Sequence, residues 1–312
     1  MSASMRASSG RSGRKQAERP LAENWPVLRP NEVHVWRVDL ARTYSMPVVR
    51  NSLLQTLSIE ERKKLEGHVL SAEQDRLFSS RGVLRTILGT YLALSPSRIE
   101  FTYGHRGKPA LASTQSDRNI QFNISHSGDW MLCAISSGCE LGVDIEMVRR
   151  NVDVEGMARL VFSDLDLRRF ACTPARSRAE LFFTSWVRRE AFVKAIGEGL
   201  HFPLAAVSGT LCAGAVQRMK AIGPAGSDAK LFLQDLDIAP EYKAALVVTS
   251  PVPPPLQFEW RPGDTSSLLP SLAQFAVAGP GRQKDAPSMP RPDQCAGTSN
   301  SRSRGWKIYS SI

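Results

Sequence analysis

The segment LGVDIEMV, residues 141–148, constrains the fold most strongly, because it alternates like a buried β-strand yet carries two acidic residues. A strand directs residues two positions apart to the same face of its sheet. Asp144 and Glu146 are therefore expected to point together, opposite the apolar residues that alternate with them. Two adjacent carboxylates repel each other, so this face needs compensation. It is either the solvated side of an edge strand or a set of oxygen ligands for a divalent cation such as Mg²⁺.

Two segments, at 71–94 and 178–197, have the periodicity of long helices. The second is expected to stop at Gly197 and Gly199. Segments that alternate like strands lie around both helices: 33–40, 230–239, 242–250, and a hairpin predicted over 130–148 with its turn near Ser137–Gly138. This order predicts an α+β fold with two similar lobes in a pseudo-twofold arrangement, each a small sheet packed on a long helix.

The two ends of the chain differ in composition from its middle. Residues 1–24 are basic and lack apolar periodicity, so we predict a disordered leader there. Residues 251–312 contain ten of the twenty prolines, and we predict a mostly disordered tail. The rest divides into an N-terminal lobe at 25–133 and a C-terminal lobe at 134–250, which contains the acidic strand.

Charge and composition limit the possible partners. The net charge is +10, but the predicted leader and tail each contribute +3, which leaves only +4 for the core. This modest excess suits an acidic protein partner at least as well as nucleic acid, and we predict no nucleic-acid partner. The sequence contains no run of about 18 apolar residues, the length that a transmembrane helix needs, so no membrane partner is expected. The five scattered cysteines match neither a disulfide framework nor a zinc site, which favours the cytoplasm.

The second predicted helix contains another group of candidate site residues. Trp186, Glu190 and Lys194 are spaced by four residues and share one helix face. Glu190 could supply a third carboxylate to a cation, and Lys194 could contact a phosphate. The alternative is an ordinary Glu–Lys pair on a solvated face, with Trp186 in the core.

Two polar turns add further candidates. Ser125 and His126, in FNISHSGDW, offer hydrogen-bond donors at a strand end, and Lys108 lies in the Gly-Pro turn of RGKPAL. A single histidine is more often structural than catalytic, and most loop lysines are simply solvated. The sequence contains no nucleophile elbow, Walker loop or dinucleotide-binding fingerprint, so these chemistries do not compete.

Four motifs occur together in a characteristic order: G-K-P at 107–109, FNISHS at 122–127, GVDIE at 142–146 and WVRREAFVK at 186–194. Over roughly residues 30–250 the chain resembles Sfp-type 4′-phosphopantetheinyl transferases. The resemblance implies two α+β lobes with coenzyme A bound in the cleft between them. It also implies a Mg²⁺-dependent reaction, in which the phosphopantetheine arm passes to a serine of an acyl or peptidyl carrier protein and adenosine 3′,5′-bisphosphate leaves.

The resemblance also implies a role for individual residues. The Mg²⁺ ligands would be Asp144, Glu146 and Glu190, and the catalytic residues would be Glu190 and Lys194. Coenzyme A would be bound by Arg76, Lys108, Ser125, His126 and Arg189, and Arg81 or Arg85 could share the task of Arg76. Arg189 departs from the family pattern, which has lysine at this position, so a fixed positive charge near the phosphates is expected rather than proton transfer.

The implied partner is an acidic apo carrier protein, and the enzyme is expected to be a monomer. One alternative is a catalytically weak relative that binds coenzyme A or a carrier protein without transfer, although the intact carboxylate triad argues against it. The other alternative is a basic nucleic-acid-binding protein, although the small excess charge of the core argues against it.

Overall fold

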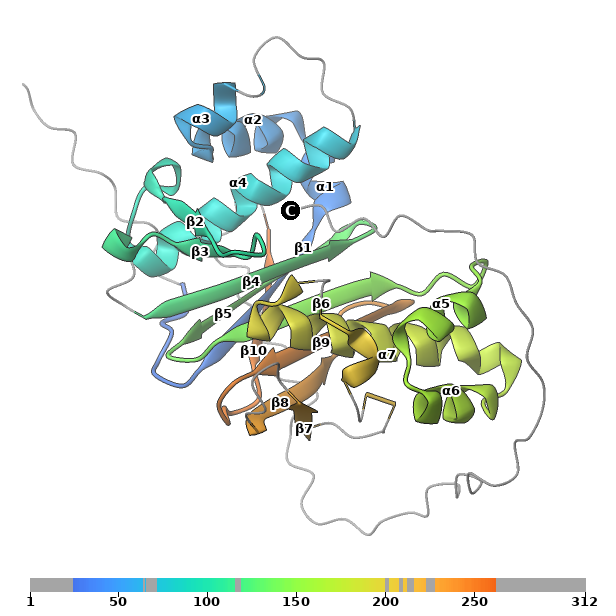
Figure 1. Cartoon of the computed structure of the whole chain (residues 1–312). Helices are drawn as coiled ribbons and strands as arrows, with labels where there is room; N and C mark the ends of the chain where they lie inside the picture. Colours follow the sequence, from blue (N-terminus) through green and yellow to red (C-terminus); the bar gives the residue numbers. More distant parts are fainter. Residues whose placement is uncertain are drawn as a thin grey trace, which may run out of the picture.

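The computed structural model describes most residues between 25 and 261 (Figure 1). The described ranges are 25–63, 65, 72–115, 119–199, 202–207, 210–211, 216–222 and 228–261. The predicted leader at 1–24, and the part of the predicted tail after 261, lie outside them.

The first lobe is a four-stranded sheet packed on the long helix α4. Its strand order is β10-β1-β5-β4. The strands are β1 (Val33–Asp39), β4 (Ile120–Ser127), β5 (Trp130–Ser137) and β10 (Leu256–Trp260), and the helices are α1 (Leu40–Ser45), α2 (Pro47–Thr56), α3 (Ile59–Lys63) and α4 (Ala72–Leu92). A small hairpin of β2 (Phe101–Tyr103) and β3 (Pro109–Leu111) lies beside them, with short 3-10 turns at Pro96–Arg98 and Ser113–Gln115. Leu84, Ile87 and Leu88 of α4 form the core with Trp36 and Met131.

The second lobe repeats this plan with the helix α7. Its strand order is β6-β9-β8-β7. The strands are β6 (Leu141–Met147), β7 (Val216–Ile222), β8 (Asp228–Leu236) and β9 (Tyr242–Val248), and the helices are α5 (Val154–Val161), α6 (Asp164–Ala171) and α7 (Ala175–Ile196), with a 3-10 turn at Leu204–Ala206. Phe182, Phe183 and Phe192 of α7 are buried in the core of this lobe. The helix ends at Gly197, whose φ of +75° provides the left-handed cap that glycine favours.

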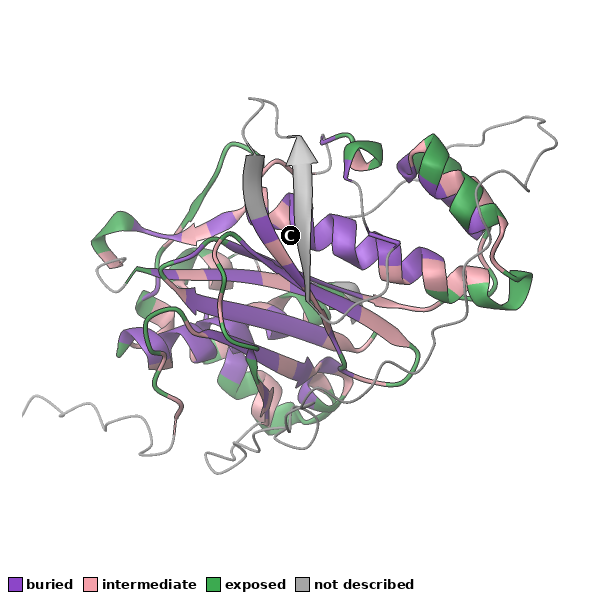
Figure 2. Ribbon diagram, turned by 90° about the horizontal axis from the view of Figure 1, so that it is seen from below, coloured by how far each residue is buried: buried purple, intermediate pink, exposed green. Residues whose placement is uncertain are grey.

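The two sheets pack face to face between the two long helices. Val33 and Val35 of β1 lie in one apolar cluster with Val143 and Ile145 of β6 and Leu246 of β9. Figure 2 shows buried residues along the central strands. The result is a layered α+β structure of helix, sheet, sheet and helix, which confirms the predicted fold of two similar lobes.

The chain passes from one lobe to the other at a different place from the one predicted. All of β5 pairs with β1 and β4, so the predicted boundary at 133/134 cuts through a strand of the first sheet. The predicted hairpin over 130–148 is also wrong, because β6 pairs with β9 instead of β5. The turn itself is present, and Gly138 has a φ of +92° that favours glycine. The chain uses this turn to enter the second sheet.

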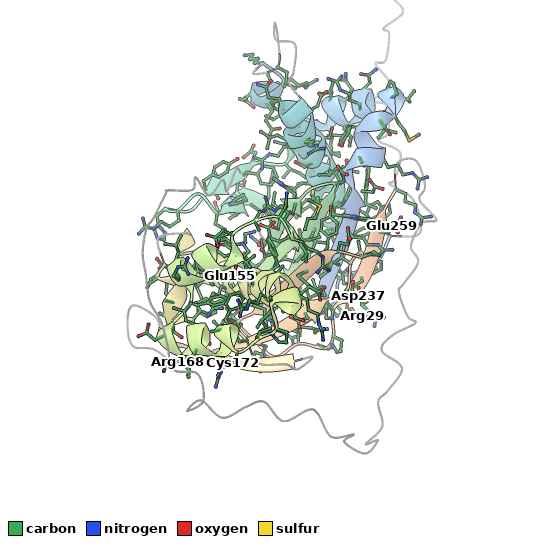
Figure 3. The ribbon with its side chains drawn as sticks, turned by 90° about the vertical axis from the view of Figure 1, so that its right-hand side faces the viewer. Arg29, Glu155, Arg168, Cys172, Asp237 and Glu259 are labelled. Carbon is green, nitrogen blue, oxygen red and sulfur yellow. The ribbon has the colours of Figure 1, made fainter. Side chains whose placement is uncertain are left out.

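The beginning of the predicted disordered tail is a strand. Residues 256–260 form β10, which pairs in parallel with β1. Phe258 and Trp260 are buried in the core of the first lobe. Glu259, labelled in Figure 3, accepts a 2.8 Å hydrogen bond from Arg37, which also donates to the carbonyl of Ile238. The tail boundary at 251 is therefore wrong, since the chain returns to the first lobe after completing the second.

Candidate active site

Close contact between β6 and α7 begins at Gly142. A Cβ atom at this position would lie 2.1 Å from the carbonyl oxygen of Ala191 and 2.4 Å from the amide nitrogen of Ala195. Only a residue without a side chain lets the helix backbone approach the strand this closely. The contact places Lys194 of α7 beside Asp144 of β6.

Asp144 lies at a junction of three elements from both lobes. Its side chain is buried, and its Oδ1 atom accepts hydrogen bonds of 2.7 Å from Lys194 Nζ and 2.7 Å from Ser125 Oγ. Lys194 Nζ and Ser125 Oγ are themselves 3.0 Å apart. Ser125 comes from β4, so the first lobe contacts the acidic strand directly.

The pKa values of Glu146 and Glu190 are shifted far from those of ordinary carboxyl groups. Burial, reinforced by the charge of Asp144, raises the pKa of Glu146 to about 7, and Ser127 opposes the shift by donating a 2.7 Å hydrogen bond. Burial and Asp144 likewise raise the pKa of Glu190 to about 7, while Lys194 opposes this rise. Three carboxylates therefore share one buried region, as the sequence predicted. Perturbations of this size are typical of functional sites.

The carboxylate oxygens of this region determine whether a cation can bind there. Among the described residues, no three His, Cys, Asp or Glu side chains stand in a ready-made metal cluster. Asp144 Oδ2 and Glu190 Oε1, however, are buried oxygens with no hydrogen-bond partner within the described part of the chain. Buried acceptors without a partner are costly and call for an explanation. Hard carboxylate oxygens of this kind suit Mg²⁺, so the residues present fit this ion.

The predicted coenzyme-binding residues are spread around this centre. His126 is exposed on β4, between the inward-facing Ser125 and Ser127. Arg76 is half-exposed and lies 3.3 Å from both the Tyr44 hydroxyl and Asp129 Oδ1, next to the β4–β5 turn. These positions remain compatible with the predicted roles.

Lys108 binds the second lobe rather than standing free. Its Nζ donates to Glu140 Oε2 at 3.0 Å, to the carbonyl of Leu141 at 3.2 Å and to the carbonyl of Ala195 at 3.5 Å. The β2–β3 turn is thereby tied to the start of β6 and the end of α7. A contact of this ammonium with coenzyme A would require it to exchange one of these partners.

Arg81 and Arg85 do not share the task of Arg76. Both donate to the carboxylate of Glu61, at 2.8 Å each. Arg85 is buried and also binds the carbonyl oxygen of Ile99 at 2.8 Å. These guanidinium groups fasten α3 and the segment before β2 to α4, which is a structural role.

The contacts of Arg189 contradict the predicted role in phosphate binding. Its side chain is fully buried and forms a 2.7 Å ion pair with Asp166 of α6. The same guanidinium donates to Ser185, Thr210 and the carbonyl of Leu204, and it lies over the ring of Phe162. Burial lowers the pKa of Arg189 to about 10, although Asp166 opposes the shift. Successive helix residues are about 100° apart, so Arg189 points into the lobe while Glu190 reaches the site.

Comparison with known proteins agrees with this arrangement. A model of the 4′-phosphopantetheinyl transferase superfamily matches residues 140–247, and a model of the N-terminal part of 4′-phosphopantetheinyl transferases matches residues 48–138. The 4′-phosphopantetheinyl transferase HetI of Nostoc sp. is 33% identical over 174 residues, which cover 56% of this chain and 72% of that protein. The chain belongs to the 4′-phosphopantetheinyl transferase superfamily. The transferase Sfp of Bacillus subtilis is 26% identical over 195 residues, or 62% of this chain and 83% of Sfp.

Membership makes the chain a phosphopantetheinyl transferase, an enzyme that uses coenzyme A as substrate and carrier proteins as partners. None of the described helices has the length and apolarity needed to cross a membrane.

Sequence reasoning missed Asn123 and Ser127 of this transferase, which face β6 together with Ser125. The two-residue alternation of FNISHS was the signal that could have revealed them.

Proposed function

We propose that this transferase moves the phosphopantetheine arm of coenzyme A to a serine of an acidic carrier protein, with Mg²⁺, and releases adenosine 3′,5′-bisphosphate. The observation that carries the proposal is the buried group of Asp144, Glu146 and Glu190, in which two oxygens have no hydrogen-bond partner among the described residues. This group lies where β4 of one lobe meets β6 and α7 of the other. A site between the lobes can bind two substrates from different sides.

Asp144, Glu146 and Glu190 would hold Mg²⁺. Asp144 Oδ2 and Glu190 Oε1 are available for this without breaking a hydrogen bond to any described residue. The bound ion would neutralise charge on the carboxylates and on the pyrophosphate of coenzyme A. Arg76, Ser125 and His126 would contact the coenzyme from the first lobe, and Lys108 would join them through the β2–β3 turn.

The transfer itself requires one proton acceptor and a fixed phosphate. The serine oxygen of the carrier forms a new bond to the phosphorus that bears the pantetheine arm. The bond from that phosphorus to the oxygen of adenosine 3′,5′-bisphosphate breaks. Glu190, or a water at the same site, takes the proton of the serine, because a carboxylate oxygen beside the carrier serine can accept it. Lys194, 2.7 Å from Asp144, would steady the phosphates.

The acidic carrier would dock on the outer surface of α5 and α6. Leu160 and Leu165 are exposed there, although both are large and apolar. Arg159, Arg168 and Arg169 are exposed on the same two helices, and Arg168 is labelled in Figure 3. Exposed leucines and arginines on the same two helices suit an acidic amphipathic helix, although the exposed Asp164 of α6 adds one negative charge. We further propose that the enzyme acts as a monomer in the cytoplasm.

Intact mass of an apo carrier protein tests this function. Incubation with the enzyme, coenzyme A and Mg²⁺ should add one phosphopantetheine, and adenosine 3′,5′-bisphosphate should form in equal amount. A chelator of divalent cations should stop the reaction, and added Mg²⁺ should restore it. Asp144→Asn should lose activity by at least about a hundredfold, whereas Arg81→Lys, which changes a guanidinium bound to Glu61, should not. Transfer that is unaffected by chelation would contradict the metal assignment.

A further inference from the structure

The strand that carries Asp144 has an edge covered by side chains. β6 pairs with β9 along one edge, and its other edge faces the first lobe. Side chains of the described residues form hydrogen bonds with that edge: Val143 N to Asn123 Oδ1 (2.8 Å), Met147 N to Ser127 Oγ (3.1 Å), Lys108 Nζ to Leu141 O (3.2 Å) and Lys194 Nζ to Val143 O (3.4 Å). The strand residues in these bonds, Leu141, Val143 and Met147, are separated by even numbers of positions, as expected for backbone groups that face away from the paired strand.

Asn123 and Ser127 both accept hydrogen bonds from backbone amides of β6, and Asn123 is the more buried of the two. It is 4% exposed, and it reaches from β4 of the first lobe into the second lobe. Val143 directly precedes Asp144, and Lys194 binds the carbonyl oxygen of Val143. The peptide groups on both sides of Val143 are thus held, one from each lobe.

We propose that Asn123 is a positioning residue, which holds the β6 backbone so that Asp144 keeps its place relative to Lys194 and Glu190. From the same face of β4, Ser125 donates to Asp144 Oδ1 itself. One strand of the first lobe therefore fixes both the backbone and the carboxylate of Asp144. Asn123 acts on the site through the Val143 amide, whose N–H it accepts.

The chemistry of the amide explains why asparagine suits this position. Its neutral oxygen accepts the Val143 N–H without adding charge near three carboxylates. A leucine has a similar shape but leaves that buried N–H unpaired, and an unpaired buried donor is costly. The strand can regain a partner for this N–H only by shifting toward solvent, which moves Asp144. The inference rests on the proposed function, because it takes Asp144 to be a metal ligand.

Two measurements on the full chain test the role. Hydrogen exchange of the Val143 amide, followed by NMR, reports the bond itself. Binding of Mn²⁺ in the presence of coenzyme A, followed by the electron paramagnetic resonance of the free ion, reports the geometry of the carboxylates without turnover. Asn123→Leu should speed the exchange and weaken Mn²⁺ binding, each by about tenfold or more. Asn123→Asp keeps the acceptor oxygen and should keep the slow exchange.

Gln121→Leu is the matched control, because Gln121 lies on the same face of β4 and is half-buried two residues earlier. It should leave both measurements unchanged. Exchange at the wild-type rate in Asn123→Leu, or faster exchange with wild-type Mn²⁺ affinity, would overturn the positioning role. If the leucine variant is insoluble, Asn123→Ala takes its place under the same criteria.

Asp144→Asn separates this inference from the proposed function. Its failure to weaken Mn²⁺ binding would contradict the metal site and, with it, the role of Asn123. Loss of Mn²⁺ binding in Asp144→Asn, combined with normal binding in Asn123→Leu, would contradict the positioning role alone.

Discussion

Arg189→Met should destabilise the enzyme while leaving its chemistry almost intact. The variant leaves the carboxylate of Asp166, whose side chain is 4% exposed, without its cation inside the lobe. Removing one partner of a buried ion pair costs about 3–5 kcal/mol. For a structured region of this size, each kcal/mol lowers Tm by roughly 2–4 °C, so a drop of about 6–20 °C is expected. At 20 °C, kcat should stay within about threefold of wild type, because the guanidinium faces α6 rather than the three carboxylates.

The neighbouring Arg188 provides a matched control for this prediction. It is also buried on α7, but its partner Asp235 is 40% exposed and can be solvated when the cation is removed. Arg188→Met should therefore lower Tm less than Arg189→Met. Adding Asp166→Asn to Arg189→Met should recover part of the lost stability. Thermal denaturation and steady-state kinetics measure both quantities, and a hundredfold loss of kcat at unchanged Tm would show that Arg189 binds the phosphates after all.

Three further perturbations test other parts of the structure. In Gly142→Ala, the new Cβ would meet the α7 backbone. The variant should lower kcat by at least about tenfold and the free energy of unfolding by about 1–3 kcal/mol. Normal kinetics would contradict the close contact. Without divalent cations, stability should fall as pH rises from about 5 to 7, because Glu146 and Glu190, with pKa values raised to about 7 from an ordinary 4.5, bind more protons when folded. Denaturant titrations at several pH values measure this slope, which Glu190→Gln should reduce. Phe258→Ala should cost about 3–5 kcal/mol in the same titrations, whereas a negligible change would mean that β10 does not pack on the first lobe.

Local features of the fold could be predicted from the sequence. Ser58 and Glu61 have the Ser-x-x-Glu spacing of a capping box, and they exchange hydrogen bonds of 2.9 and 3.2 Å at the start of α3. The two long helices occur within a few residues of their predicted ends. The placement of Asp144 and Glu146 on the same face of the sheet follows directly from strand geometry. Each of these features depends on residues fewer than five positions apart.

Long-range features could not be predicted in the same way. β10 pairs with β1, although more than 200 residues separate the two strands in the sequence. Prolines directly precede β10, so its short alternating pattern was not predicted to be a strand. A tight turn at Gly138 does not reveal whether the next strand pairs with the last one or joins another sheet. The direction of Arg189 depends on where Asp166 lies, and α6 was not predicted at all. Here the tertiary partner, rather than the local pattern, decides the role of the residue.

The proposed site combines residues from both lobes. Asp144, Glu146 and Glu190 belong to the second lobe. From the first lobe, Ser125 and Ser127 donate to Asp144 and Glu146, and Asn123 accepts from the Val143 amide beside them. β10 then returns the chain to the sheet that contains β4, and Arg37 ties this sheet to the Ile238 carbonyl of the other lobe. The hydrogen bonds from Asn123 and Ser127 to the β6 backbone cross between the lobes, so they depend on how the two sheets pack. The geometry of the carboxylates therefore depends on the packing of the two lobes, and not on the second lobe alone.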